Sequence, residues 1–138
     1  MAFVCLDGPQ VKKKARDLGY SQTLMGRYRL LPGIKDRKTK GHAERAAINT
    51  PVQGGAADVV MMAMLRIQES KKLRDLGWTL LLQIHDEVIL EGPDESKEEA
   101  LVEVKKCMEE PWDGYGLEPL SVKLEVDARI GKSWYECK

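Results

Sequence analysis

The sequence predicts an α+β fold, in which a small antiparallel sheet packs against several helices. Apolar residues recur at helical spacing after Pro51, as expected of an amphipathic helix. By contrast, the runs on either side of His85-Asp86-Glu87 are short and almost wholly apolar, which is typical of strands. The expected order is helix, hairpin, helix pair, hairpin, helix and strand. This order separates the helices from the sheet, and 138 residues suffice for one domain or a piece of one.

The first expected elements are a basic helix and a short hairpin. The helix covers residues 12–18, and Gly19 can end it. The hairpin covers residues 20–31, where tyrosines and leucines favour strands and Met25-Gly26 supplies the bend.

Two helices are expected next, over residues 42–49 and 51–75. Pro51 must interrupt the first helix or begin the second, because proline lacks the amide hydrogen and clashes with the preceding turn. Gly54 and Gly55 each cost about 1 kcal/mol inside a helix relative to alanine. Either another segment approaches the backbone closely there, or the helix kinks.

A second hairpin follows Gly77, which ends the long helix. Its expected strands are residues 78–84 and 88–90, and His85-Asp86-Glu87 forms the tip between them.

The remaining residues are expected to form a helix and a strand. Asp94 is a suitable N-cap for a helix over residues 95–109. Residues 120–126 alternate apolar and charged side chains, as an edge or half-buried strand does. Trp134 and Tyr135 are expected to pack back on the body. The helix residues expected to face inward are Leu101, Val102 and Met108.

Charge is balanced in total but not along the chain. Lys+Arg and Asp+Glu number 22 each, so net charge says nothing about nucleic acid. However, residues 1–50 contain 11 basic and 4 acidic side chains, whereas residues 91–138 contain 7 and 13. This asymmetry suggests a basic end that meets an anion, although two solvated surfaces of opposite sign would look the same.

The cysteines and the apolar runs argue against a disulfide-rich protein, a zinc site and a membrane span. Cys5, Cys107 and Cys137 are odd in number and lack a CxxC pair, which argues against a disulfide framework or a zinc site. No apolar run approaches the roughly 18 residues of a membrane span. The first nine residues are too short and too weakly basic for a targeting peptide.

Three groups of residues are candidates for chemistry. An imidazole and two carboxylates in His85-Asp86-Glu87 interrupt apolar strands, which suggests a metal or acid–base site, or alternatively a solvated turn. Arg45, Asn49 and Gln53 share one helix face, and such side chains bind phosphates or base edges. The alternative is a polar face in solvent. A basic cluster suited to phosphates, or to solvent, comprises Arg27, Arg29, Lys35, Arg37, Lys38 and Lys40.

Three motifs give the sequence a family resemblance. Residues 44–58, ERAAINTPVQGGAAD, resemble the segment before the catalytic hairpin of the palm in family A (DNA polymerase I-like) DNA polymerases. Residues 83–88, QIHDEV, resemble motif C of that family, and residues 23–27, TLMGR, resemble its T-x-x-G-R motif. They occur in the family's order. Residues 12–138 therefore resemble the C-terminal part of a palm, whereas residues 1–11 look like an unrelated or disordered start.

The resemblance implies roles for the second hairpin. Asp86 would be one of two palm carboxylates that hold the catalytic Mg²⁺ ions, and Glu87 would be the adjacent, less critical acid. His85 would contact the primer end. The residues around motif C are most similar to plant organellar members, which implies a mitochondrial or chloroplast location.

The resemblance also implies a DNA surface. Arg45, Asn49 and Gln53 would line the primer–template and the nascent base pair, and Arg27 would contact the nucleic acid backbone. The partners would be primer–template DNA and, in the complete enzyme, deoxynucleoside triphosphates, with no membrane. Gly55 departs from the Ser or Thr that the family usually has there, which removes no ligand.

Catalysis by the chain alone is not expected. Two-metal chemistry needs carboxylates that bridge both ions, but neighbouring residues on a strand point to opposite faces. The family's other metal aspartate and its fingers helix do not appear in these residues. The sequence thus predicts a DNA-directed DNA polymerase fragment that is inactive alone. The alternatives are a non-catalytic DNA-binding module and a gene remnant.

Overall fold

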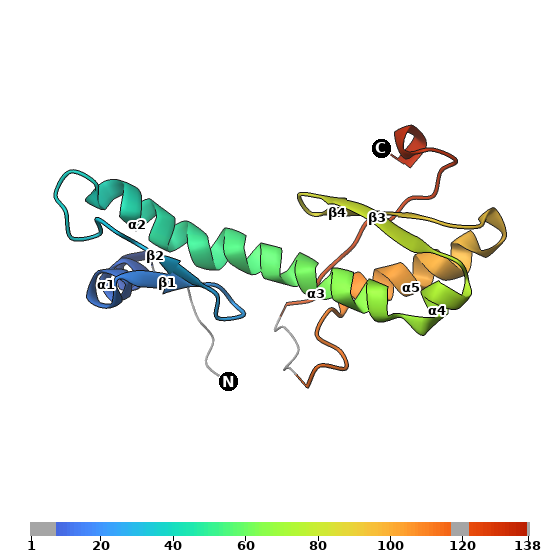
Figure 1. The fold of residues 1–138 in the computed structure, drawn as a ribbon, viewed down its shortest axis with the longest axis horizontal. Coiled ribbons are helices and arrows are strands. Elements are labelled where there is room, and N and C mark those ends of the chain that lie inside the picture. The colour runs from blue at the N-terminus through green and yellow to red at the C-terminus, as the bar shows by residue number, and fades with distance from the viewer. Residues whose placement is uncertain (1–7, 117–121, 138) are drawn as a thin grey trace. The chain divides into compact units, whose positions relative to one another are not determined.

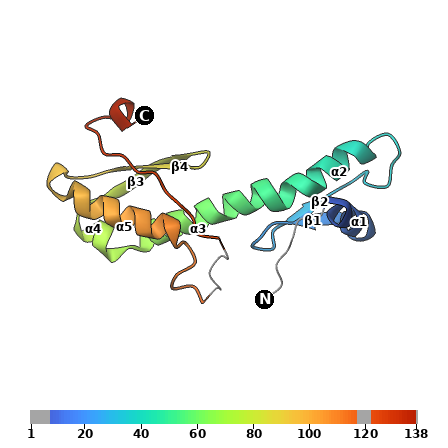
Figure 2. The same ribbon diagram turned by 180° about the vertical axis from the view of Figure 1, so that it is seen from behind.

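The computed structural model describes residues 8–116 and 122–137. The chain divides into two compact units, Met1–Asp58 and Val59–Lys138. Figures 1 and 2 show helices together with two hairpins. Each hairpin is a two-stranded antiparallel sheet. The predicted α+β class with a small antiparallel sheet is therefore confirmed. Among the described residues, none of the helices has the length and apolar character that a bilayer crossing requires.

The first unit contains the predicted basic helix, hairpin and second helix. Their bounds are α1 (Gly8–Leu18), β1 (Tyr20–Gln22), β2 (Tyr28–Leu30) and α2 (Lys40–Asn49). Gly19 ends α1 as predicted, with a φ of 78° and an amide that donates to the Ala15 carbonyl at 2.8 Å. Small side chains let α1, the hairpin and α2 approach one another. The buried core comprises Ala15, Leu31, Ile34, Ala43, Ala46 and Ala47.

Pro51 interrupts the hydrogen bonding after α2 without ending the helical path. It lies in a π-helical turn, η1 (Thr50–Gly54), which leads into α3 (Gly55–Glu69). Because proline has no amide hydrogen, the carbonyl of Ala47, four residues back, loses its usual donor. The hydroxyl of Ser21 in β1 donates to that carbonyl at 2.9 Å. The first hairpin is therefore tied to the helix at the point where proline weakens it.

At Gly54 another segment approaches the backbone closely, which is one of the two possibilities that the sequence suggested. A Cβ atom at this position would lie 2.5 Å from Cγ2 of Thr23, in the loop of the first hairpin. Any side chain there would push this loop away from η1. At Gly55 the corresponding contact, with Cβ of Leu24, is an ordinary 3.6 Å.

The second unit contains the second hairpin and the acidic helix. Following α3, its elements are α4 (Lys71–Asp75), β3 (Thr79–Ile84), β4 (Glu87–Glu91), the 3-10 turn η2 (Asp94–Ser96), α5 (Lys97–Glu109) and the 3-10 turn η3 (Trp134–Cys137). Figures 1 and 2 show β3 and β4 alongside α5. The core of the unit comprises Ile67, Leu73, Ala100 and Cys107. Burial raises the pKa of the Cys107 thiol, as expected of a structural cysteine.

The second hairpin has the predicted tip and one irregularity. Leu80 pairs with Leu90 and Leu82 pairs with Ile89, so Leu81 is an extra residue in β3. At the open end of the hairpin, the Trp78 ring covers Gly92. A Cβ at Gly92 would lie 2.4 Å from the indole Cδ2. The indole Nε1 donates to the Ser96 hydroxyl at 2.9 Å.

The predicted continuous helix over residues 51–75 is wrong at Ser70. Here α3 ends, and Ser70 adopts a ψ of 110° as the N-cap of α4. Its hydroxyl accepts the Leu73 amide at 3.3 Å, which satisfies a donor that a helix start leaves free. The break allows both Ile67 and Leu73 to reach the core.

Two details predicted for the acidic helix are also wrong. Asp94 does not cap it, because η2 intervenes and the Asp94 carboxylate pairs with the Lys97 ammonium at 2.9 Å. Val102 is 65% exposed rather than inward-facing, whereas Met108 packs against the core as predicted. The buried positions of α5 are Ala100 and Cys107, so the inward face is rotated relative to the prediction.

The strand and the packed tail that were predicted near the C-terminus are not found in the described residues. Residues 122–126 form no strand, and residues 120 and 121 lie outside the described residues. A strand needs a neighbour for its backbone groups, whereas the Val126 amide donates to the Glu109 side chain at 3.4 Å. Tyr135 is 89% exposed instead of packing on the body, and Trp134 is half exposed.

Candidate functional site

The tip of the second hairpin holds His85 in an unfavourable backbone conformation. Ile84 pairs with Glu87, so His85 and Asp86 form a two-residue loop. His85 has a φ of 55°, the only positive φ at a non-glycine position in the described residues. Glycine favours such a position, and another residue there costs about 1 kcal/mol or more. The Gln83 side-chain amide donates to the His85 carbonyl and holds the loop.

Asp86 and Glu87 are exposed at this tip. Asp86 lies in the loop and Glu87 is the first residue of β4. In the described parts of the chain, no group of three or more His, Cys, Asp or Glu side chains is arranged to hold a metal ion. These residues alone do not fit a complete metal centre, and Asp86 and Glu87 could supply only part of one.

Arg45, Asn49 and Gln53 form an exposed polar line along α2 and η1. Residues four apart on an α-helix drift around the axis by about 40°. A π-helical turn has more residues per turn, so the step from Asn49 to Gln53 does not continue that drift. The turn at Pro51 therefore keeps the three side chains on one face.

Arg27 lies beside the Gln53 end of this line. Its Nη2 donates to the Gly54 carbonyl at 3.1 Å, and its Nε donates to Oδ1 of Asp58 at 2.6 Å. The Arg27 side chain is 51% exposed, whereas that of Asp58 is 1% exposed. The guanidinium thus contacts α3 with one edge and remains open to solvent.

Asp58 is the most buried carboxylate of this surface. Burial opposes its ionisation, but hydrogen bonds from Thr23, the Met25 amide and Arg27 outweigh it and lower the pKa of Asp58. The carboxylate is therefore charged at neutral pH, with both oxygens engaged by the loop of the first hairpin.

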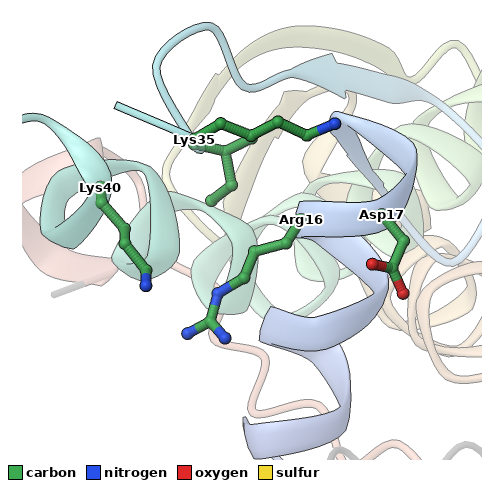
Figure 3. A pocket seen from close by; sticks show the side chains of 5 residues that line it. Arg16, Asp17, Lys35 and Lys40 are labelled. Carbon is green, nitrogen blue, oxygen red and sulfur yellow. The ribbon is translucent and has the colours of Figure 1, made fainter. Parts of the chain in front are cut away.

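A basic pocket in the same unit is lined by Arg16, Asp17, Ile34, Lys35 and Lys40. Figure 3 shows the Arg16 and Lys40 side chains extending toward each other from α1 and α2, whereas Asp17 points away from them. Glu44 accepts from Arg16 Nε at 3.0 Å and lies 3.9 Å from Lys40 Nζ. Arg16 mainly lowers the pKa of Glu44. The Glu44 carboxylate therefore offsets part of the positive charge around this pocket.

Comparison with known proteins decides the family. Residues 9–136 match the model of DNA polymerase family A. The chain belongs to DNA polymerase family A. It is 56% identical over 127 residues to DNA polymerase I B, chloroplastic/mitochondrial, of Arabidopsis thaliana, and 43% identical over 130 residues to DNA polymerase I of Lactococcus lactis. These matches cover 92% and 93% of this chain, but 12% and 14% of the relatives.

A solved family A structure has the same fold. The POL domain of Pol1 from M. smegmatis, in complex with DNA primer–template and dNTP, matches with a TM-score of 0.75 and 36% identity. The match covers 86% of this chain and 20% of that domain. The family resemblance drawn from the three motifs is confirmed, and the chain spans only a small part of its relatives.

The predicted site residues fall into the two units. Arg27, Arg45, Asn49 and Gln53 belong to the first unit, and His85, Asp86 and Glu87 to the second. Sequence reasoning missed Asp58. The available signal was a single acid within the apolar run from Gly55 to Leu65, because a charge in such a run needs a buried partner.

Proposed function

We propose that this chain is part of a DNA-directed DNA polymerase and that its first unit holds primer–template DNA. The observation that carries the proposal is the exposed line of Arg45, Asn49 and Gln53 on a family A chain. Arginine binds phosphates or base acceptors, and Asn and Gln read base edges. The related domain from M. smegmatis was solved with DNA primer–template and dNTP, which supports this assignment.

Within this proposal, each side chain has a separate task. Arg27 binds a backbone phosphate through its exposed edge. Arg45, Asn49 and Gln53 contact the primer–template near its end. His85 contacts the primer terminus, and the strained loop fixes its position.

Asp86 supplies one oxygen ligand to a divalent cation, with Glu87 beside it. We assign Mg²⁺ because this hard cation prefers carboxylate oxygens and is usually bound by one or two of them with substrate phosphates. When bound, the ion stabilises charge on phosphoryl oxygens. The remaining ligands come from outside the described residues.

The test is a gel-shift titration of the chain with a primer–template duplex at several salt concentrations. The affinity should fall steeply as salt rises, because phosphate contacts release counterions. Arg45→Ala should weaken binding about tenfold, a loss of about 1.4 kcal/mol. Arg129→Ala is the matched control, since Arg129 is exposed and belongs to the other unit. Equal losses in both variants would refute a site on α2.

Primer extension distinguishes a polymerase from a binding module. We expect the chain alone to bind the duplex without extending it, because its described residues do not complete a metal centre. Extension with Mg²⁺ and four nucleotides that disappears in Asp86→Ala would show that the chain carries a complete active site. Absence of binding at low salt, together with a non-cooperative melt, would favour the gene remnant.

We also propose a mitochondrial or chloroplast location. The support is the similarity to the Arabidopsis relative named chloroplastic/mitochondrial. Immunofluorescence of the endogenous protein with organelle markers tests it, and signal outside both organelles would contradict it.

A further inference from the structure

We propose that Asp58 is a positioning residue, which fixes the Thr23–Arg27 loop on η1 and directs the Arg27 guanidinium toward a nucleic-acid phosphate. This inference rests on the proposed function, in which the first unit binds DNA. It gives the T-x-x-G-R motif a partner 31 residues away in the sequence.

The Asp58 carboxylate is a buried charge. Asp58 is 1% exposed, and its two carboxylate oxygens are used by separate parts of the loop. Oδ2 accepts the Met25 amide at 3.0 Å, and Oδ1 accepts Arg27 Nε at 2.6 Å. A buried carboxylate is costly unless its hydrogen bonds are complete, so this arrangement holds the loop in one conformation.

The Thr23–Arg27 loop is closed on itself by its own hydrogen bonds. The Thr23 amide donates to the Arg27 carbonyl at 3.0 Å, and the Arg27 amide donates to the Thr23 hydroxyl at 3.2 Å. Gly26 has a φ of 81°, which allows the sharp return. Arg27 thus starts from a backbone whose position Asp58 and Gly54 determine.

The protein engages only part of the Arg27 guanidinium. This group carries five N–H donors, of which one from Nε and one from Nη2 bond to the protein. With the side chain 51% exposed, the remaining donors on the outer edge are available to an anion. A phosphate accepts two parallel N–H bonds from such a fork. Because the inner edge is already held, little further rotamer freedom is lost when a phosphate binds.

A purely structural clamp would use the same contacts, and a double-mutant cycle separates the two roles. Binding of a primer–template duplex is measured by gel shift from 50 to 200 mM salt for the chain, Arg27→Ala, Asp58→Asn and the double variant. Loss of one phosphate contact reduces the slope of log affinity against log salt by about 0.9.

We expect Arg27→Ala to show this reduction, and Asp58→Asn to show most of it although Arg27 is still present. In the Arg27→Ala background, Asp58→Asn should change the affinity less than twofold, because Asp58 acts through Arg27. Independent, additive losses would overturn the inference. So would an unchanged slope in Asp58→Asn, accompanied only by a lower melting temperature.

Two further outcomes of the binding experiment are possible: the unsubstituted chain does not bind DNA, or Asp58→Asn does not fold. If the unsubstituted chain does not bind the duplex at low salt, the proposed function fails and this inference fails with it. If Asp58→Asn does not fold by circular dichroism, Gly54→Ala replaces it, because its Cβ would displace the loop at Thr23 and leave both charges present. An unchanged salt slope in Gly54→Ala would then overturn the inference.

Discussion

Ser21 supplies by its side chain the donor that Pro51 cannot supply by its backbone. Ala47 is fully buried, and its carbonyl accepts the Ser21 hydroxyl at 2.9 Å, whereas Pro51 offers it no amide hydrogen. An unsatisfied buried carbonyl costs about 1–3 kcal/mol. One hydroxyl therefore makes a proline compatible with a helix that carries the proposed binding line.

We predict that Ser21→Ala lowers the free energy of unfolding by about 1–2 kcal/mol, measured by urea denaturation. In a Pro51→Ala background the loss should be smaller, because an alanine amide can donate to the Ala47 carbonyl. Ser133→Ala, at an exposed position, is the control and should stay within about 0.5 kcal/mol of the unsubstituted chain. The same loss in both backgrounds would contradict the compensation.

Asp58 should also give the first unit an acid-sensitive stability. Its pKa is lowered by folding, so the unfolded chain takes up the proton first as the pH falls. The stabilisation is present above the ordinary aspartate value of about 3.9 and is lost as the pH falls below it. We predict that the stability difference between the chain and Asp58→Asn narrows between pH 5 and pH 2 in urea titrations. A difference independent of pH would contradict this.

At the scale of elements, the second hairpin combines a strained tip with regular strands. Relief of the positive φ at His85 is worth about 1–2 kcal/mol, from which glycine's greater chain entropy subtracts about 0.5–1 kcal/mol. We therefore predict that His85→Gly raises the unfolding free energy by about 0.5–1 kcal/mol while weakening primer binding.

The same substitution elsewhere provides the control for His85→Gly. His42 lies in α2, where glycine has a lower helix propensity than histidine. His42→Gly should therefore destabilise the chain, the opposite sign, in the same urea experiment. Destabilisation by both variants would argue against strain at the tip.

Elements with local signals could be predicted from the sequence, but their exact ends could not. Gly19 and Gly77 both have the positive φ that ends a helix. Because glycine adopts this conformation readily, both helix ends could be predicted from the residue type. Ser70 is a good N-cap by type, yet the apolar pattern continues on both sides, so only packing reveals the break. Val102 fits an apolar face by spacing, but Cys107 and Ala100 occupy the core instead.

For the whole molecule, the order of motifs predicted the family, whereas the site's internal contacts could not be predicted. Arg27 and Asp58 are 31 residues apart, and Ser21 and Ala47 are 26 apart. Such contacts depend on how separate elements meet, and no local pattern encodes that. Sequence reasoning therefore named Arg27 but assigned it no partner.

The apolar surface of β3 predicts self-association of the isolated chain. Leu81 is 53% exposed and Leu82 is 39% exposed, and in the described residues β3 and β4 pair only with each other. An open apolar strand edge attracts further strands. We predict that Leu81→Lys reduces oligomers in sedimentation velocity experiments. Leu65→Lys, at a similarly exposed helical position, should leave them unchanged.

Because the Trp78 ring packs on Gly92, tryptophan fluorescence can report on the base of the second hairpin. An indole that donates to Ser96 and covers a bare glycine backbone changes its emission when water reaches it. With Trp112 and Trp134 replaced by phenylalanine, the remaining signal would come from this one ring. Stopped-flow fluorescence could then follow the opening of the hairpin separately from the melting of the rest of the chain.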